Sequence, residues 1–197
     1  MVTLLSAQGG TGKTFLALMA GVSIALGMLL LGIPTRRGKV ALFSGEDGPD
    51  IMRHRLKFIC RAMDVHPSAL DGRLHILDAT QGDPTLFHEV NAKGTRYGAT
   101  TSSYEALRAY VEEHEIDVLI VDNASDTFDA QEIDRARVRG FMRALARIAQ
   151  VKGGAVLLLA HVDKGSSRRD RTGTEGYSGS TAWHNSARSR LFMSRDK

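Results

Sequence analysis

The sequence has 197 residues, of which 43% are hydrophobic and 24% are charged, and its formal net charge is +4 at pH 7. This length suits one domain with an ample core, and the charge modestly favours an acidic partner such as nucleic acid. A single cysteine, Cys60, excludes an intrachain disulfide framework and gives no zinc pattern, so we expect a cytoplasmic protein. We expect residues 1–197 to form a single domain, either a fragment or one trimmed close to its core at both ends.

A glycine-rich stretch separates a short apolar strand, residues 2–5, from a long apolar run that begins at Phe15: Ala7, Gln8, Gly9, Gly10, Thr11, Gly12, Lys13 and Thr14. Strand, glycine-rich turn, Gly-Lys-Thr and helix form the context of a phosphate-binding P-loop. Glycines let the backbone wrap around phosphate oxygens, which the bared N–H groups and the helix N-terminus favour. We therefore expect these residues to bind a nucleotide, with Lys13 at the β- and γ-phosphates and the Thr14 hydroxyl on Mg²⁺.

The P-loop departs from the strict pattern at its first position, where Ala7 replaces glycine. Alanine is the smallest substitute. The alternative is a glycine-rich turn that happens to end in Gly-Lys-Thr, but the flanking strand and helix favour the P-loop.

The apolar run over residues 15–33 just reaches membrane-spanning length. We predict instead a helix over about residues 12–30, because phosphate-binding helices pack against a sheet and are often apolar nearly all round. Glycines at 21, 27 and 32 also interrupt the run. We therefore expect no membrane association.

Buried strands alternate with helices along the rest of the chain. We predict strands over residues 39–44, 74–78, 117–122, 155–160 and 190–194. Helices are predicted over residues 50–63, with Asp50 as the N-cap, and over residues 104–115 and 132–151. Residues 79–103 are polar and weakly patterned, which predicts an irregular insertion.

This alternation predicts an α/β fold, a mostly parallel twisted sheet with helices on both faces. Ligands of such sheets bind beyond the carboxyl ends of the strands. Four positions follow or end predicted strands: Ala7, Glu46, Asp122 and His161. The sequence therefore predicts one active site at that edge.

Each of these polar positions suits a step of nucleotide hydrolysis. Asp122 closes an apolar run, which is the Walker B pattern of a carboxylate that orders the Mg²⁺ shell; the alternative is a cap for the next element. Asn123 cannot take a proton from water, so Glu46 is the best candidate base and Asp47 the runner-up. Either acid could instead favour a helix N-terminus. His161 can report the γ-phosphate, or be a partly buried histidine bonded to backbone.

Five stretches of the chain match one known family: Ala-Gln-Gly-Gly-Thr-Gly-Lys-Thr, Gly-Glu-Asp-Gly-Pro with Arg-His-Arg-Leu, Val-Asp-Asn-Ala-Ser-Asp-Thr-Phe-Asp, Leu-Ala-His-Val-Asp-Lys and Gly-Ser-Thr-Ala-Trp-His-Asn-Ser-Ala-Arg. Together they resemble RecA-like ATPases of the RepA group, which are hexameric replicative helicases and related ATPases of plasmids and phages, akin to the DnaB-type core. The resemblance covers nearly the whole chain and weakens over residues 79–103.

The resemblance implies a RecA-like P-loop fold, Mg²⁺-dependent ATP hydrolysis and a homo-oligomeric ring, expected to be hexameric. It implies that Glu46 is the catalytic glutamate and His161 the sensor. Arg188 matches the arginine finger, which acts on ATP bound by the neighbouring subunit, with Arg190 as the fallback. The alternative for Arg188 is a surface cation.

A basic segment follows the predicted His161 strand, and its cations are Lys164, Arg168, Arg169 and Arg171. In the family's fold this loop faces the central channel, which implies sequence-independent, salt-sensitive contacts to single-stranded DNA. A charge run of this kind can also be merely solvated.

The leading hypothesis is a replicative DNA helicase of the RepA type. Two alternatives stay open: an ATPase of the same fold in recombination, partition or regulation without unwinding, and a nucleotide-gated scaffold that scarcely turns over. ATP is preferred by default, because the guanine-specific Asn/Thr-Lys-x-Asp tetrad is absent from the sequence.

Overall fold

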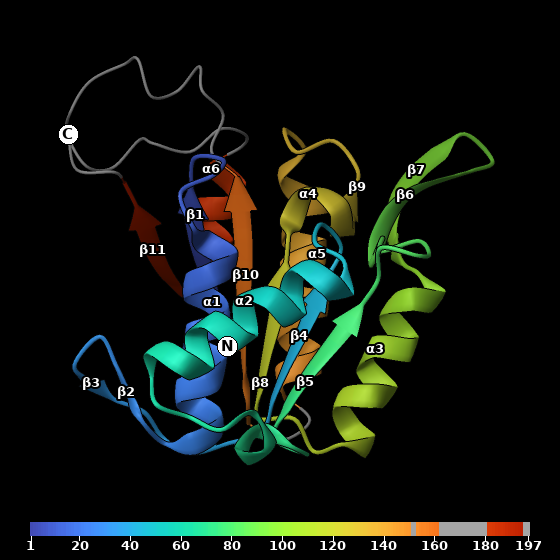
Figure 1. Cartoon of the computed structure of the whole chain (residues 1–197). Helices are drawn as coiled ribbons and strands as arrows, with labels where there is room; N and C mark the ends of the chain where they lie inside the picture. The colour runs from blue at the N-terminus through green and yellow to red at the C-terminus, as the bar shows by residue number, and fades with distance from the viewer. Residues whose placement is uncertain (151–152, 162–180, 195–197) are drawn as a thin grey trace.

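The computed structural model describes residues 1–150, 153–161 and 181–194 (Figure 1). Within these residues the main sheet has six strands in the order β11-β1-β10-β8-β4-β5, and every neighbouring pair is parallel. The strands are β1 (Val2–Ala7), β4 (Val40–Ser44), β5 (Leu74–Asp78), β8 (Val118–Asp122), β10 (Ala155–His161) and β11 (Ser189–Met193). The α/β prediction is confirmed, because helices flank this parallel sheet as in a RecA-like P-loop fold.

Helices cover both faces of the sheet (Figure 1). Helices α1 (Lys13–Leu26) and α2 (Pro49–Ala62) pack on one face, and α3 (Ser102–Glu113) and α5 (Arg135–Gln150) on the other. Strand residues alternate between the two cores: Leu4 and Leu158 join the α3–α5 core, whereas Leu5 and Leu159 join the α1–α2 core. Both sides of each central strand are therefore buried, which explains why these strands read as continuous apolar runs.

Helix α1 ends at Leu26, four residues before the predicted end near residue 30. Gly27 takes the left-handed conformation, with φ 71°, and the N–H of Met28 bonds to the carbonyl of Ser23. This glycine-based cap closes the helix. Residues 29–30 and 33–34 then form a short hairpin, β2 (Leu29–Leu30) and β3 (Ile33–Pro34). None of the helices in the described ranges is both long enough and apolar enough to cross a bilayer.

The predicted N-cap of α2 is wrong. Gly48 is the cap, Pro49 occupies the first helical position, and Asp50 lies in the first turn. Proline suits that position because its fixed φ is already helical and its missing N–H would have no partner there. Helix α3 begins earlier than predicted, because the Thr101 side chain accepts a hydrogen bond from the N–H of Tyr104 and so caps it. A 3₁₀ helix, η1 (Pro67–Leu70), precedes β5.

Residues 79–103 are not irregular, as was predicted, but carry a β-hairpin. Strands β6 (Phe87–Ala92) and β7 (Thr95–Thr100) pair antiparallel, and β6 also pairs with the short strand β9 (Phe128–Asp129). The turn residues Lys93 and Gly94 both have positive φ, 51° and 80°. Two such residues are the requirement of the tight turn that suits the twist of a hairpin.

An aromatic cluster fixes this hairpin and the short helices to the α5 face. Phe87 stacks on Phe128 with ring centroids 5.9 Å apart, and Phe128 lies 5.3 Å from Phe141. A Cβ at Gly98 would overlap the Phe87 ring, so this glycine makes room for it. Trp183 of α6 (Thr181–Ser186) packs edge-on against Phe128 and Phe141. Another short helix, α4 (Ala124–Thr127), follows β8.

Candidate functional site

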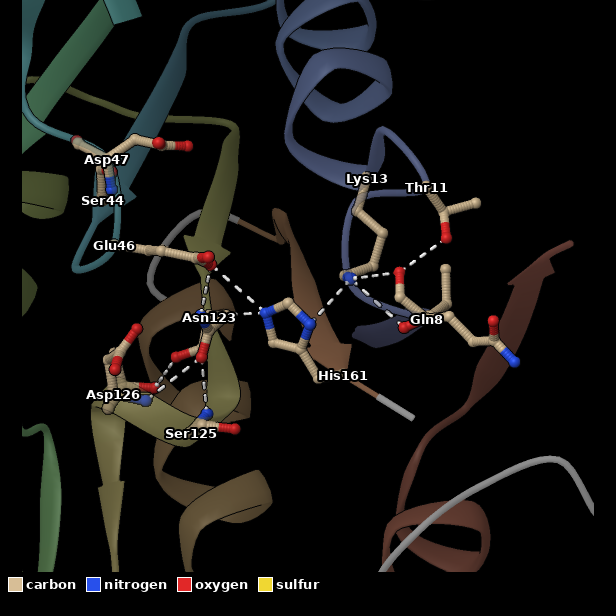
Figure 2. A network of polar contacts seen from close by, with 12 residues as sticks. Gln8, Thr11, Lys13, Ser44, Glu46, Asp47, Asn123, Ser125, Asp126 and His161 are labelled. Carbon is tan, nitrogen blue, oxygen red and sulfur yellow. Dashed lines mark hydrogen bonds and ion pairs between the residues drawn. The ribbon is translucent and has the colours of Figure 1, made fainter. Parts of the chain in front are cut away.

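The predicted site residues from four separate strands converge at one edge of the sheet. The strand register places Ala7 opposite His161 and Ser44 opposite Asp122, so β1, β10, β4 and β8 end together. Glu46 lies just beyond β4. Figure 2 shows the resulting polar network.

The glycine-rich stretch links β1 to α1 as predicted. The Thr11 hydroxyl donates to the Gln8 carbonyl over 2.6 Å, and Gly12, with φ 97°, is the N-cap of α1 without a side-chain cap. Around Gly9 and Gly12 there is open space within 4 Å of where a Cβ would stand. Bare N–H groups at a helix start, with room beside them, fit the phosphates of a nucleotide.

Ala7, the departure from the strict P-loop pattern, is the last residue of β1 and is fully buried. Its φ is not among the positive values, so the backbone there does not require glycine. Alanine is therefore compatible with the backbone conformation at this position.

Lys13 lies folded back over its own loop. Its Nζ donates to the carbonyls of Ala7 and Gln8 at 3.2 and 3.5 Å, and lies 3.1 Å from Nδ1 of His161. Burial lowers the pKa of Lys13, while the carboxylates of Asp122 and Glu46 act in the opposite direction.

His161 connects Lys13 to Glu46, as Figure 2 shows. A lysine ammonium can only donate, so Nδ1 of His161 accepts and Nε2 carries the proton. That Nε2 lies 3.2 Å from Oε2 of Glu46, to which it donates. Asn123 Nδ2 donates to the same Glu46 oxygen over 2.8 Å.

These contacts keep Glu46 ionised. Burial by itself would raise its pKa, but hydrogen bonds from Asn123 and His161, with the nearby charge of Lys13, bring the pKa below its ordinary value. The Glu46 side chain is also 47% exposed. An ionised carboxylate that solvent can reach is able to accept a proton from a water molecule.

Asp122 is buried, with 1% exposure, and its Oδ2 has no hydrogen-bond partner among the described residues. Its pKa is raised, first by burial and then by the charges of Glu46 and Asp47, against a hydrogen bond with the Thr14 side chain and the charge of Lys13. An unpaired carboxylate oxygen beside a threonine hydroxyl fits the hard-oxygen chemistry of Mg²⁺.

No set of three or more His, Cys, Asp or Glu side chains converges to hold a metal in the part of the chain that the structure describes. Mg²⁺ in phosphate-transfer sites commonly uses one or two protein ligands, with phosphates and waters completing its shell. Thr14 and Asp122 would be such a pair.

The P-loop, Glu46 and His161 line one shared cavity of about 260 Å³. Its walls are formed by residues of the P-loop, of the segment after β4, of α2 and of β10: Gly10, Gly12, Lys13, Thr14, Phe15, Glu46, Asp47, Arg55 and His161. The runner-up base, Asp47, forms an ion pair with Arg55. Glu46, by contrast, faces His161 and Asn123.

Arg188 lies at the opposite end of the sheet. Its N–H bonds to the carbonyl of Val2 at the start of β1, and it lines a separate cavity of about 590 Å³ beside Arg139 and Arg143 of α5. Arg190 is paired in register with Leu4, also away from the P-loop. Neither arginine joins the nucleotide cavity of its own chain. The predicted DNA-binding cations, Lys164, Arg168, Arg169 and Arg171, lie outside the described residues.

Sequence analysis missed two side chains of the site. Asn123 was considered only as a residue that cannot act as a base. In the structure its Nδ2 donates to Glu46, and its Oδ1 accepts from the N–H groups of Ser125 and Asp126. Arg55, the second arginine of the Arg-His-Arg-Leu stretch, was given no role. Its signal was present, since a cation two turns into a helix can reach back to an acid just before the helix starts.

Comparison with known proteins agrees with this geometry. A protein-family model described as an AAA domain matches residues 1–167, which include Lys13, Glu46, Asp122 and His161. No curated protein matches the chain. The family model covers most of the chain and the whole of the site at the sheet edge. The chain therefore belongs to this AAA domain family, a family of P-loop, nucleotide-dependent ATPases.

Proposed function

We propose that this ATPase is the motor core of a replicative DNA helicase of the RepA type, which hydrolyses ATP with Mg²⁺ and moves on single-stranded DNA. The observation that carries the proposal is the convergence of Lys13, His161 and Glu46 in one network near Asp122, whose buried Oδ2 has no hydrogen-bond partner in the described part of the chain. This set supplies a phosphate-binding cation, a base and a metal-binding carboxylate at one edge of the sheet.

In the proposed reaction Glu46 accepts a proton from the water that attacks the terminal phosphate. The amide of Asn123 and the Nε2–H of His161 hold the Glu46 carboxylate, so its position is set before substrate arrives. Lys13 exchanges the carbonyls of Ala7 and Gln8 for phosphate oxygens. Mg²⁺, when bound, neutralises phosphate charge; Thr14 and Asp122 would hold it.

His161 has the contacts that a γ-phosphate sensor needs. One ring nitrogen faces Lys13 and the other faces Glu46. When Lys13 turns towards phosphate, Nδ1 of His161 loses its hydrogen-bond donor, and the imidazole ring is then free to reorient. His161 is also the last residue of β10, directly before the segment with the predicted DNA-binding cations. This continuity supports a coupling of nucleotide state to DNA contact.

The placement of Arg188 supports an assembled ring. An arginine at the far end of the sheet from its own P-loop can act on ATP only in a neighbouring subunit. Such a finger is worth about 10³ to 10⁵ in rate in phosphoryl-transfer enzymes. We therefore propose a homo-oligomer, a hexameric ring, whose subunits complete one another's active sites.

The test is ATP turnover with and without single-stranded DNA, alongside the native mass and a strand-displacement assay. Lys13→Ala should abolish tight ATP binding. Glu46→Gln should retain binding while turnover falls by about 10²- to 10⁴-fold, the range for loss of a general base. Turnover stimulated by DNA with strand displacement supports the helicase. Turnover without displacement would instead favour the non-unwinding ATPase, and binding without turnover the nucleotide-gated scaffold.

A further inference from the structure

The nucleotide cavity contains a second cation besides Lys13. Arg55, on α2, contacts the Asp47 carboxylate through both ends of its guanidinium fork: Nη1 to Oδ2, and Nη2 to Oδ1 at 3.4 Å. Both side chains line the cavity that Lys13, Thr14 and Glu46 also line. They are largely shielded from solvent, with side-chain exposures of 31% for Arg55 and 14% for Asp47.

The backbone fixes the position of this pair. The buried Ser44 hydroxyl donates to the carbonyl of Asp47 over 2.7 Å and accepts from the N–H of Asp47. On the other side, Met52 and Ile59 are buried and anchor α2 to the core. Arg55 is therefore held facing the cavity rather than free on the surface.

A neighbouring pair on the same helix shows the contrast. Arg53 and Asp50 also form an ion pair, but their side chains are 63% and 93% exposed. Neither residue is among those that line the nucleotide cavity. Exposed pairs of this kind contribute little to stability, so Arg53 and Asp50 provide a matched control for Arg55 and Asp47.

Charge balance indicates what Arg55 does there. Two carboxylates line the cavity, those of Glu46 and Asp47, and both lie close enough to Asp122 to raise its pKa; together these charges repel an incoming polyphosphate. Arg55 neutralises Asp47, and its guanidinium has five N–H donors, enough to hold a carboxylate and a phosphate at once. Asp47, which Arg55 contacts, directly follows Glu46, the group proposed to activate water at the terminal phosphate, and all three residues line the cavity.

We propose that Arg55 binds the terminal phosphate of the nucleotide from within the same chain, that Asp47 positions it, and that this pair makes the site prefer a nucleoside triphosphate over the diphosphate. This inference rests on the proposed nucleotide site and assigns it a further binding residue. Because the cation belongs to the same subunit, its contribution to binding does not depend on ring assembly, unlike that of Arg188.

The experiment compares affinities for ADP and for a non-hydrolysable ATP analogue, both with Mg²⁺, by calorimetry. Arg55→Ala should lower the affinity for the triphosphate by about 10- to 100-fold, which is the range for loss of a hydrogen bond to a charged group. The affinity for the diphosphate should fall by less than about 3-fold. Arg55→Lys should restore part of the triphosphate affinity, since it returns the charge without the fork. Arg53→Ala should leave both affinities unchanged.

Asp47→Asn separates a binding role of the pair from a merely structural one. It keeps a side chain of similar size but removes the charge that positions Arg55, so triphosphate affinity should fall, by less than in Arg55→Ala, while diphosphate affinity changes by less than about 3-fold. Equal losses for both nucleotides in Arg55→Ala, no loss in either, or an unchanged triphosphate affinity in Asp47→Asn would each overturn the inference. If Arg55→Ala does not fold, the triphosphate and diphosphate affinities of Arg55→Lys and Asp47→Asn still test the inference.

Failure of the proposed nucleotide site itself gives a different result. In that case the wild-type protein binds neither nucleotide, or Lys13→Ala binds both as the wild type does. Normal dependence on Lys13 with no selective effect at Arg55 would refute the role of Arg55 alone.

Discussion

Replacing Asp122 by asparagine should stabilise the nucleotide-free protein at neutral pH. The carboxylate is 1% exposed and its Oδ2 has no partner among the described residues. Removing the charge from an unsatisfied buried oxygen relieves a desolvation cost of about 1–3 kcal/mol. For a domain of this size each kcal/mol shifts the Tm by about 2–4 °C, so Asp122→Asn should raise the Tm by about 2–12 °C.

The gain should depend on pH. Burial, with the charges of Glu46 and Asp47, raises the pKa of Asp122 in the folded state. Below the ordinary aspartate pKa of about 3.9 both states are protonated, and the wild type and the variant differ little. As the pH rises towards the higher folded pKa, the unfolded chain releases its proton first, so the wild type loses stability. Asparagine does not titrate, so its advantage grows with pH and is complete above the folded pKa.

Thermal unfolding followed by circular dichroism at pH 5 and pH 8, with EDTA and without nucleotide, measures both effects. Asp50→Asn, at a side chain that is 93% exposed, is the control and should shift the Tm little. A variant that melts below the wild type at pH 8, or whose advantage shrinks between pH 5 and pH 8, would refute the reasoning. Addition of ATP and Mg²⁺ should favour the wild type, because only it retains the proposed metal-binding carboxylate.

Three further predictions address assembly, DNA contact and packing. Arg188→Ala should bind ATP but hydrolyse it slowly. Mixing it with Lys13→Ala should give more ATP turnover than the sum of the two variants assayed apart. If the subunits demonstrably co-assemble and turnover does not rise, Arg188 does not act across the interface. Replacing Arg168, Arg169 and Arg171 together by alanine should weaken single-stranded DNA binding and make its log–log salt slope shallower by up to about 2. An unchanged slope would mean that these cations are only solvated. Gly154→Ala should lower stability by about 1–3 kcal/mol in denaturant unfolding, because its Cβ would collide with the backbone carbonyl of Asp117; Gly82→Ala, which has open space, is the control.

The parallel sheet was predictable because its central strands are buried on both sides. Residues 118–122 and 155–161 are apolar nearly throughout, and such runs indicate strands whatever their neighbours are. The β6–β7 hairpin was not predictable in the same way. Its strands are polar and half exposed, and its turn uses Lys93 where a positive φ favours asparagine, aspartate or glycine. Tertiary packing of Phe87 against Phe128 and Phe141 holds it in place.

The site was predictable to the extent that strand ends specify it. Ala7, Glu46, Asp122 and His161 converge because parallel strands bring their carboxyl ends to one edge. The partnership of Glu46 with Asn123 could not be predicted, since it depends on side-chain direction at the start of α4. The Arg55–Asp47 pair likewise depends on the angle at which α2 leaves the sheet.

Trp183, which ties α6 to the aromatic cluster, also gives the protein an intrinsic optical reporter. It is the single tryptophan of the chain, so all indole emission comes from one place. Its ring is 5% exposed and borders a cavity of about 20 Å³ that His161 and Glu132 also line. A shift in emission when ligand is added therefore reports the surroundings of His161 and of the helix that leads to Arg188, without an attached dye that could disturb either.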